Sequence, residues 1–329
     1  MTSFFPLKML PLLIPAVFLI VLGIVWLPEH PELLENAYVH SFKTAFIGIL
    51  LEAMPFVLLG ALLSSLLRVF VPDEWISRWI PQRPVPAILF GCLLGILFPV
   101  CECGMIPLVR RLMQKGMPLY VAIVFILSGP ILNPVVYGAT LTAFRTHPWL
   151  AYARMGLAFA VAAAVGLIIY VTVTKSPLRL SIRRESGEAH RLTARGGRFV
   201  SVLVHTSDEF FEMGKYLIIG CLLTSGIQTF MDHGSLEAIG GMPLGSYLFM
   251  MGLAFVLSLC STSDAFVAAT FLHTFPSGSL LAFMVLGPML DFKNSLMLLS
   301  LFKTRFAFYL FFLIFSAVFV GSVLASFWL

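Results

Sequence analysis

Long apolar runs follow one another along nearly the whole sequence. Of its 329 residues, 59% are hydrophobic and only 11% are charged, whereas a typical soluble domain has about 25% charged residues. So few charges cannot cover a surface that faces water, and lipid must therefore surround most of the chain. Runs of about 20 apolar residues are long enough to cross a bilayer. Candidate spans lie at 9–27, 43–70, 86–113, 117–144, 149–174, 210–231, 244–272, 278–302 and 306–328.

These spans predict an all-α polytopic membrane protein. Only helices and closed barrels satisfy the backbone in lipid, and the sequence does not show the alternating strands of about ten residues that form membrane barrels. The first run, Met9 to Leu27, is long for the apolar part of a signal peptide and is followed by no small-residue cleavage site. We therefore expect residues 1–30 to form an extra N-terminal transmembrane helix.

The formal net charge of +5 does not indicate a nucleic-acid partner. Much of the excess positive charge lies in residues 175–207, between two apolar spans. No aromatic residues alternate with the basic ones there. Loops rich in arginine usually stay on the cytoplasmic side of a membrane, so this segment is predicted to be a basic cytoplasmic loop. Its arginines are Arg179, Arg183, Arg184, Arg191, Arg195 and Arg198.

An internal repeat divides the chain into two membrane units, residues 40–174 and 208–329. Three landmarks recur in the same order at an offset of 158 to 160 residues. The first is a glutamate followed eight residues later by glycine and a small-residue motif, the second is a cysteine, and the third is a Gly-Pro motif. The matched pairs are Glu52 with Glu212, Gly60 with Gly220, Cys101 with Cys260, and 129–133 with 287–291.

Two matched spans are interrupted, at 98–107 and at 260–264. The pieces on either side are short for a crossing and suit re-entrant hairpins. If both are hairpins, each unit has an odd number of crossings, and the two copies are inverted repeats with their basic loops on one side. If both are full crossings, the repeats are parallel. We favour inverted repeats, because broken helices at matching places in two halves mark the binding site of many transporters.

The first interruption places two thiols and a carboxylate at membrane depth, in Cys101, Glu102 and Cys103. Thiolates bind soft metals and metalloids, and Cys260 would approach them if the two hairpins meet. The alternative is that membrane cysteines are small, inert packing residues, which is our reading of Cys92 and Cys221. All five cysteines fall in apolar segments, which argues against a disulfide framework.

Several charged residues fall near or inside apolar spans. Each costs about 2.5–3.5 kcal/mol at the bilayer centre, so these residues should face the interior and pair. Asp264 and Asp291 are possible proton or cation carriers, or else a structural ion pair or a helix cap. Asp291 and Lys293 are expected to pair with one another or with repeat-related groups. The residues are Glu52, Glu102, Glu212, Asp264, Asp291 and Lys293.

Two motifs should shape the helices around these groups. The cluster 260–264, with Ser261 and Ser263 before Asp264, resembles a cap that opens a second helical piece. A Gly-Pro pair followed three residues later by Asn133 or Asp291 should unwind its helix. Such a break either lines a substrate path or is only a kink.

Four motifs together resemble the ArsP/YraQ-like permease family of bacteria. They lie at 99–107, 128–134, 260–266 and 287–294, and the resemblance covers about residues 40–325. It implies a multi-pass protein of the bacterial inner membrane. In the ArsP branch the resemblance implies efflux of trivalent organoarsenicals such as methylarsenite, bound here by Cys101 and Cys103. Glu102 departs from the small residue common at this place, which implies a changed selectivity or coupling.

The sequence therefore favours a secondary transporter that exports a soft, thiol-reactive solute. The alternative is a channel-like or partner-docking membrane subunit that handles sulfur or redox species or another small solute. No enzyme motif, cofactor or metal site is predicted, and the expected partners are the lipid bilayer, the small-molecule or metalloid solute, and a second copy or a second membrane or periplasmic subunit. Solute contacts are predicted at Cys101, Glu102, Cys103, Asn133, Cys260, Ser261, Ser263 and Asp264, and coupling or gating roles at Glu52, Asp264, Asp291, Lys293 and Asn294.

Overall fold

The computed structural model describes residues 37–70, 81, 83–97, 102–173, 198–230, 244–272 and 274–327. In these ranges the chain forms helices and no β-strand, which confirms the all-α class. The predicted N-terminal helix over 1–30, Cys101, and residues 175–197 of the predicted basic loop lie outside the described residues. Residues 198–207, also assigned to that loop, instead form the first turns of a helix.

The same order of helices occurs twice. The first half contains α3 (Ala37–Phe70), α5 (Pro84–Leu97), α6 (Glu102–Gln114), α7 (Leu119–Ser128), α8 (Pro134–Ala143) and α9 (Trp149–Thr172). The second contains α11 (Arg198–Phe230), α13 (Gly245–Leu257), α14 (Ser263–Thr270), α15 (Ser277–Met289), α16 (Phe292–Leu301) and α17 (Thr304–Ser326). Each half is thus a long helix, two broken pairs and a second long helix. The opposite orientation of the two copies stays a prediction, as do the division into repeats and the re-entrant hairpins.

The predicted unwinding at the Gly-Pro motifs is confirmed in one half only. Helix α7 ends at Ser128, directly before Gly129 and Pro130, whereas α15 continues through Gly287 and Pro288 to Met289. Asn133 then caps α8 by accepting a hydrogen bond from Val136 N at 2.9 Å, and Asp291 caps α16 by accepting one from Asn294 N. Matched residues therefore perform the same capping role.

Four helical stretches of the described chain are long and apolar enough to cross a membrane. They are Val39–Leu66, Trp149–Thr172, Ser277–Leu301 and Thr304–Ser326. The stretch over α15 and α16 is mostly buried inside the protein, whereas the other three leave most of their surface outside. Exposed leucine, valine and phenylalanine side chains cover these three helices, as expected for surfaces that contact lipid.

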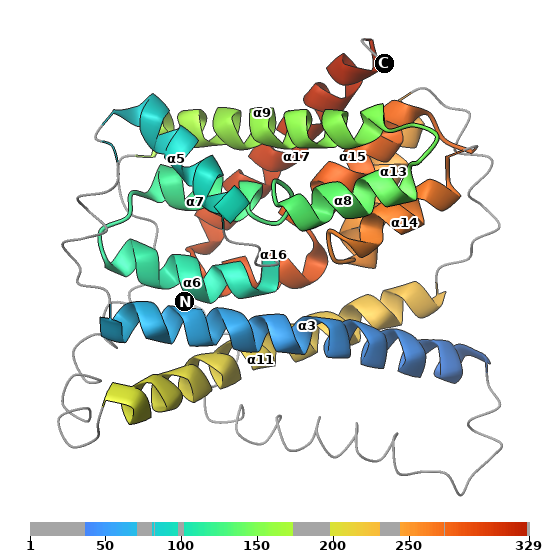
Figure 1. The fold of residues 1–329 in the computed structure, drawn as a ribbon. Coiled ribbons are helices and arrows are strands. Elements are labelled where there is room, and N and C mark those ends of the chain that lie inside the picture. Colours follow the sequence, from blue (N-terminus) through green and yellow to red (C-terminus); the bar gives the residue numbers. More distant parts are fainter. Residues whose placement is uncertain are drawn as a thin grey trace, which may run out of the picture.

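The long helices α3 and α11 cross one another in a layer of their own, against α6 and α16 (Figure 1). Two matched glycines allow this close packing. A Cβ added at Gly60 would lie 2.5 Å from the backbone of Gly104 in α6, and one added at Gly220 would lie 3.1 Å from Cα of Lys293 in α16. Thus α3 and α11 each lie directly against the first turn of a half-helix.

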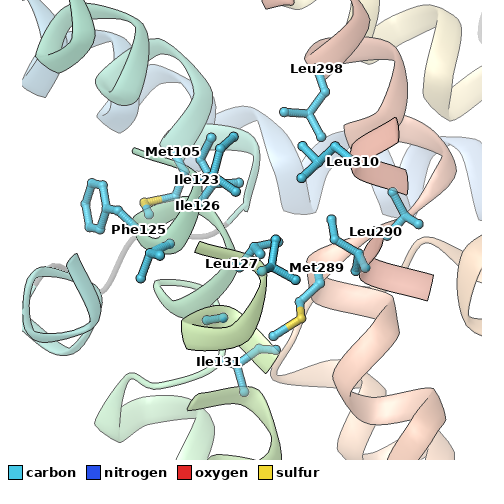
Figure 2. Close-up of a cluster of buried hydrophobic side chains, with 14 of the residues drawn as sticks. Met105, Ile123, Phe125, Ile126, Leu127, Ile131, Met289, Leu290, Leu298 and Leu310 are labelled. Carbon is cyan, nitrogen blue, oxygen red and sulfur yellow. The ribbon is translucent and has the colours of Figure 1, made fainter. Parts of the chain in front are cut away.

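A buried apolar cluster joins the two halves. Met105, Ile123, Leu127 and other side chains around α7 face Met289, Leu290, Leu298 and Leu310 of the second half (Figure 2). The two halves of the chain also meet through contacts of α9 with α15 and α17. In water, burial of apolar surface contributes about 25 cal/mol per Å². Lipid supplies no such hydrophobic force between helices, so close packing must hold this cluster together.

We expect Gly60→Ala to lower the free energy of unfolding by about 1–3 kcal/mol, because the new methyl group meets the backbone of Gly104. The melting temperature of the detergent-purified protein should fall accordingly. Gly48→Ala on the same helix is the matched control, since a Cβ there meets nothing within 4 Å and alanine is the better helix former. Heating followed by size-exclusion chromatography measures both. Equal melting temperatures for the two variants would contradict the close approach.

Candidate functional site

A small cavity lies where α3, the start of α6, the break before α14 and the start of α16 converge. We call it the central cavity. Its volume is about 10 Å³, which is near the minimum for one water molecule. Residues of both halves line it: Ile49, Glu52, Ala53, Glu102, Cys103, Cys260 and Lys293. The predicted residues Glu52, Glu102, Cys103, Cys260 and Lys293 are therefore brought together.

Lys293 is the buried cation of this site. Its Nζ lies 3.4 Å from Glu102 Oε1 and 3.4 Å from Asp291 Oδ2, and it donates a hydrogen bond to the carbonyl of Ser258 at 3.0 Å. The ammonium thus contacts three segments: the start of α6, the break after α13, and the cap of α16. The expected pairing of Asp291 with Lys293 is present, and Glu102 is its second partner.

Ser258 has an unusual backbone that supports this contact. It is the C-cap of α13 and has φ 48° and ψ 44°, in the left-handed region. For a residue other than glycine this conformation costs about 1–3 kcal/mol. Its Oγ accepts a hydrogen bond from the backbone N–H of Phe292 at 3.2 Å, so the same residue contacts α16 through both its carbonyl and its hydroxyl.

Glu102 is the first residue of α6, where its carboxylate complements the positive end of the helix dipole. The side chain is 2% exposed. One oxygen, Oε1, pairs with Lys293, whereas Oε2 has no hydrogen-bond partner. A buried carboxylate oxygen without a partner is unusual and belongs to a residue that lines the central cavity.

Two thiols of the described chain, Cys103 and Cys260, line the cavity. Cys103 is buried, and Cys260 is half-buried with its Sγ 3.7 Å from the hydroxyl of Thr262. Cys221 of α11, which we expected to be an inert packing residue, is buried in the apolar core and lies near Lys293 and Cys103. Because α11 crosses α3, a third described thiol lies near the site. Only the packing of the long helices could reveal this.

Glu52 does not follow the expectation that charged residues in spans are buried. Its side chain is exposed, and Oε1 accepts a hydrogen bond from Ser263 Oγ at 2.9 Å. Glu52 therefore lies at the mouth of the central cavity, where α3 contacts the first turn of α14.

Asp264 lies in a second charged site. Arg154 Nη2 is 2.7 Å from Asp264 Oδ2 and 2.9 Å from Oδ1, with relative exposures of 0% and 2% for the two side chains. The guanidinium also donates to Thr140 Oγ1 at 2.9 Å and to the Ser261 carbonyl at 3.0 Å. The sequence reasoning missed Arg154, although an arginine in the apolar run 149–174 was the available signal.

The cap-like cluster at 260–264 is only partly as expected. A helix begins at Ser263, but no side chain caps it. The amides of Ser263 and Asp264 instead donate to the Cys260 carbonyl. The side chains of Ser263 and Asp264 contact Glu52 and Arg154, so they join distant helices rather than closing their own.

The other predicted residues are buried near these two sites. Asn133 is held by its capping bond in the first half. Asn294 is 1% exposed, and its Oδ1 has no hydrogen-bond partner. A further ion pair joins Arg110 Nη1 to Glu212 Oε2 at 2.7 Å, between α6 and α11. Within the described ranges no three His, Cys, Asp or Glu side chains gather as metal ligands would.

Comparison with known proteins identifies relatives along most of the chain. A family described as "Predicted permease" (ArsP_1) matches residues 38–327. The UPF0718 protein YcgR of Bacillus subtilis is 46% identical over 289 residues, covering 87% of this chain and 97% of that protein. A protein of Streptococcus mutans, named a putative two-component membrane permease complex subunit, is 37% identical over 261 residues, covering 79% and 87%. The UPF0718 protein YraQ of Escherichia coli is 29% identical over 76 residues, covering 23% and 22%. No solved structure matches.

We expect Arg154→Met to destabilise the protein by about 3–5 kcal/mol, because it leaves the buried carboxylate of Asp264 without its partner. The double variant Arg154→Met with Asp264→Asn removes both charges and should recover much of the loss. Thermal unfolding in detergent measures the series, with Arg145→Met at an exposed position as the control. A double variant no more stable than the single one would contradict a direct pairing.

Proposed function

Because the chain belongs to the ArsP_1 family of predicted permeases and is a multi-pass membrane protein, we propose that it is a secondary transporter of the bacterial inner membrane which exports a soft, thiol-reactive solute. The solute binds in the central cavity. Cys103 and Cys260 are its ligands from the two halves, and Cys101, which precedes α6, is a third. Trivalent organoarsenicals such as methylarsenite are the representative class.

The observation that carries this proposal is the meeting of Cys103 and Cys260 in one cavity, although they belong to different halves of the chain. The chemistry requires no other reactant. A trivalent arsenical with two hydroxyl groups condenses with two thiols to form two As–S bonds, and each hydroxyl leaves as water with a thiol proton. The reverse reaction with two waters releases the solute on the other side.

The cavity must widen before a solute can enter. At about 10 Å³ it has room for roughly one water molecule, so this arrangement is closed to the solute. One wall comes from α3 through Ile49, Glu52 and Ala53. Since α3 and α11 form their own layer (Figure 1), displacement of this helix pair against α6 and α16 is the simplest opening movement.

Expression in an arsenic-sensitive bacterium tests the proposal. We expect the wild-type chain to raise resistance to methylarsenite, and Cys103→Ser combined with Cys260→Ser, or with Cys101→Ser, to abolish that gain, because a single thiol cannot form the two bonds. Cys92→Ser is the matched control, a buried cysteine of α5 that is not among the residues lining the cavity. Equal resistance in the double variants and the wild type would refute thiol binding of the solute.

A second candidate function is a membrane subunit that works with a partner protein. The name of the Streptococcus mutans relative, a two-component permease complex subunit, favours it. In this case we expect a tagged chain, solubilised from its native membrane, to bring down a second polypeptide in stoichiometric amount. Purification of the chain alone, together with solute flux in liposomes that contain nothing else, would speak against an obligatory partner.

A further inference from the structure

Two buried charged sites lie at matched helix contacts, but their charges differ. The contact of α8 with α14 corresponds to that of α16 with α6. Beside the first, Asp264 of α14 and Arg154 of the neighbouring helix α9 form a balanced pair with contacts of 2.7 to 2.9 Å, and Arg154 also donates to Thr140 of α8. At the second, one ammonium, Lys293, lies 3.4 Å from two carboxylates, Glu102 and Asp291. The first site is closed and neutral, whereas the second is loose and has one negative charge too many.

The surplus charge needs a partner. Glu102 and Asp291 are 2% and 0% exposed, so water does not solvate them as it would at a surface. An uncompensated charge is costly at membrane depth, and a buried charge left without a partner is strongly destabilising. One monovalent cation beyond Lys293 would restore neutrality.

The geometry selects the atom that holds this cation. Asp291 Oδ1 accepts a hydrogen bond from Asn294 N. Asp291 Oδ2 has no hydrogen-bond partner, but it lies 3.4 Å from Lys293 Nζ and so faces the ammonium. Glu102 has one oxygen left: Oε1 pairs with Lys293, and Oε2 has no hydrogen-bond partner. A metal cation needs several oxygen ligands, and among the described residues that line the cavity only Glu52 and Glu102 have side-chain oxygens. A proton needs none.

We propose that Glu102 carries a proton in this closed state and exchanges it with water through the central cavity, which makes it the coupling-ion site of the permease. The proton binds at Oε2 and leaves to a water molecule when the cavity opens. The inference rests on the permease function proposed above and not on the identity of the solute. The charged or titratable groups facing Glu102 are Glu52 of α3, Cys103 of α6, Cys260 and Asp264 around the start of α14, and Asp291 and Lys293 at α16.

Infrared spectroscopy of the purified full chain tests this without any solute. A protonated carboxylic acid has a C=O stretching band that a carboxylate lacks, and exchange into D₂O shifts it. We expect the wild type to show this band at neutral pH and to lose it as the pH rises. Glu102→Gln should remove the band, and Glu102→Asp should move it. Glu52→Gln, which changes another carboxylate of the same cavity, should leave it intact.

Asp291→Asn gives a sharper test, because a purely structural role of Glu102 does not predict that this variant changes the protonation of Glu102. Asparagine should preserve the cap of α16, as Asn133 caps α8, but it removes the surplus charge. Glu102 should then ionise, and the band should vanish at neutral pH.

A band that survives Glu102→Gln, or a wild type without one, overturns the proposal. Loss of the band when NaCl replaces choline chloride at constant pH also overturns it, in favour of a bound sodium ion. Failure of the methylarsenite experiment would leave these spectra unchanged, so the two proposals fail separately.

Discussion

The buried ammonium of Lys293 holds the centre of this protein together. It contacts Glu102 at the start of α6, the Ser258 carbonyl after α13, and Asp291 at the cap of α16. Each of these groups lies at the end of a broken helix, where backbone groups lack helical partners. At membrane depth no water replaces such partners, so the broken ends must satisfy one another. The strained backbone of Ser258 is consistent with a conformation imposed by this convergence.

The two halves of the chain have the same order of helices, but they differ in the charged residues of the two buried sites. Asn133 and Asp291 are matched caps, yet only Asp291 adds a charge. Lys293 and Asp264 have apolar counterparts, Val135 and Met105, at the offsets that align the two halves. Each half therefore contributes different charges to equivalent helix contacts. One site is a tight ion pair and the other is a small cavity lined by thiols, so the candidate function is concentrated at the second site.

Much of this arrangement could be predicted from the sequence. The long apolar runs, the breaks and the pairing of Asp291 with Lys293 are local features, encoded by composition and by glycine and proline within a few residues. The matched interruptions at 98–107 and 260–264 also led to the expectation that Cys260 would approach the first break if the two hairpins meet. The exposure of Glu52, the proximity of Cys221 and the capture of Asp264 by Arg154 could not be predicted, because each depends on which face of a long helix meets a partner more than 100 residues away.

By itself the sequence determined that this protein is helical, lies in a membrane and belongs to a permease family. These properties follow from hydropathy, helix-breaking residues and recurring motifs, which act over short distances along the chain. Only the tertiary structure decided which charges neutralise one another and which carboxylate oxygen has no partner. The physical reason is that charge balance in a low-dielectric interior depends on separations of about 3 to 4 Å between side chains, and such separations are set by helix packing.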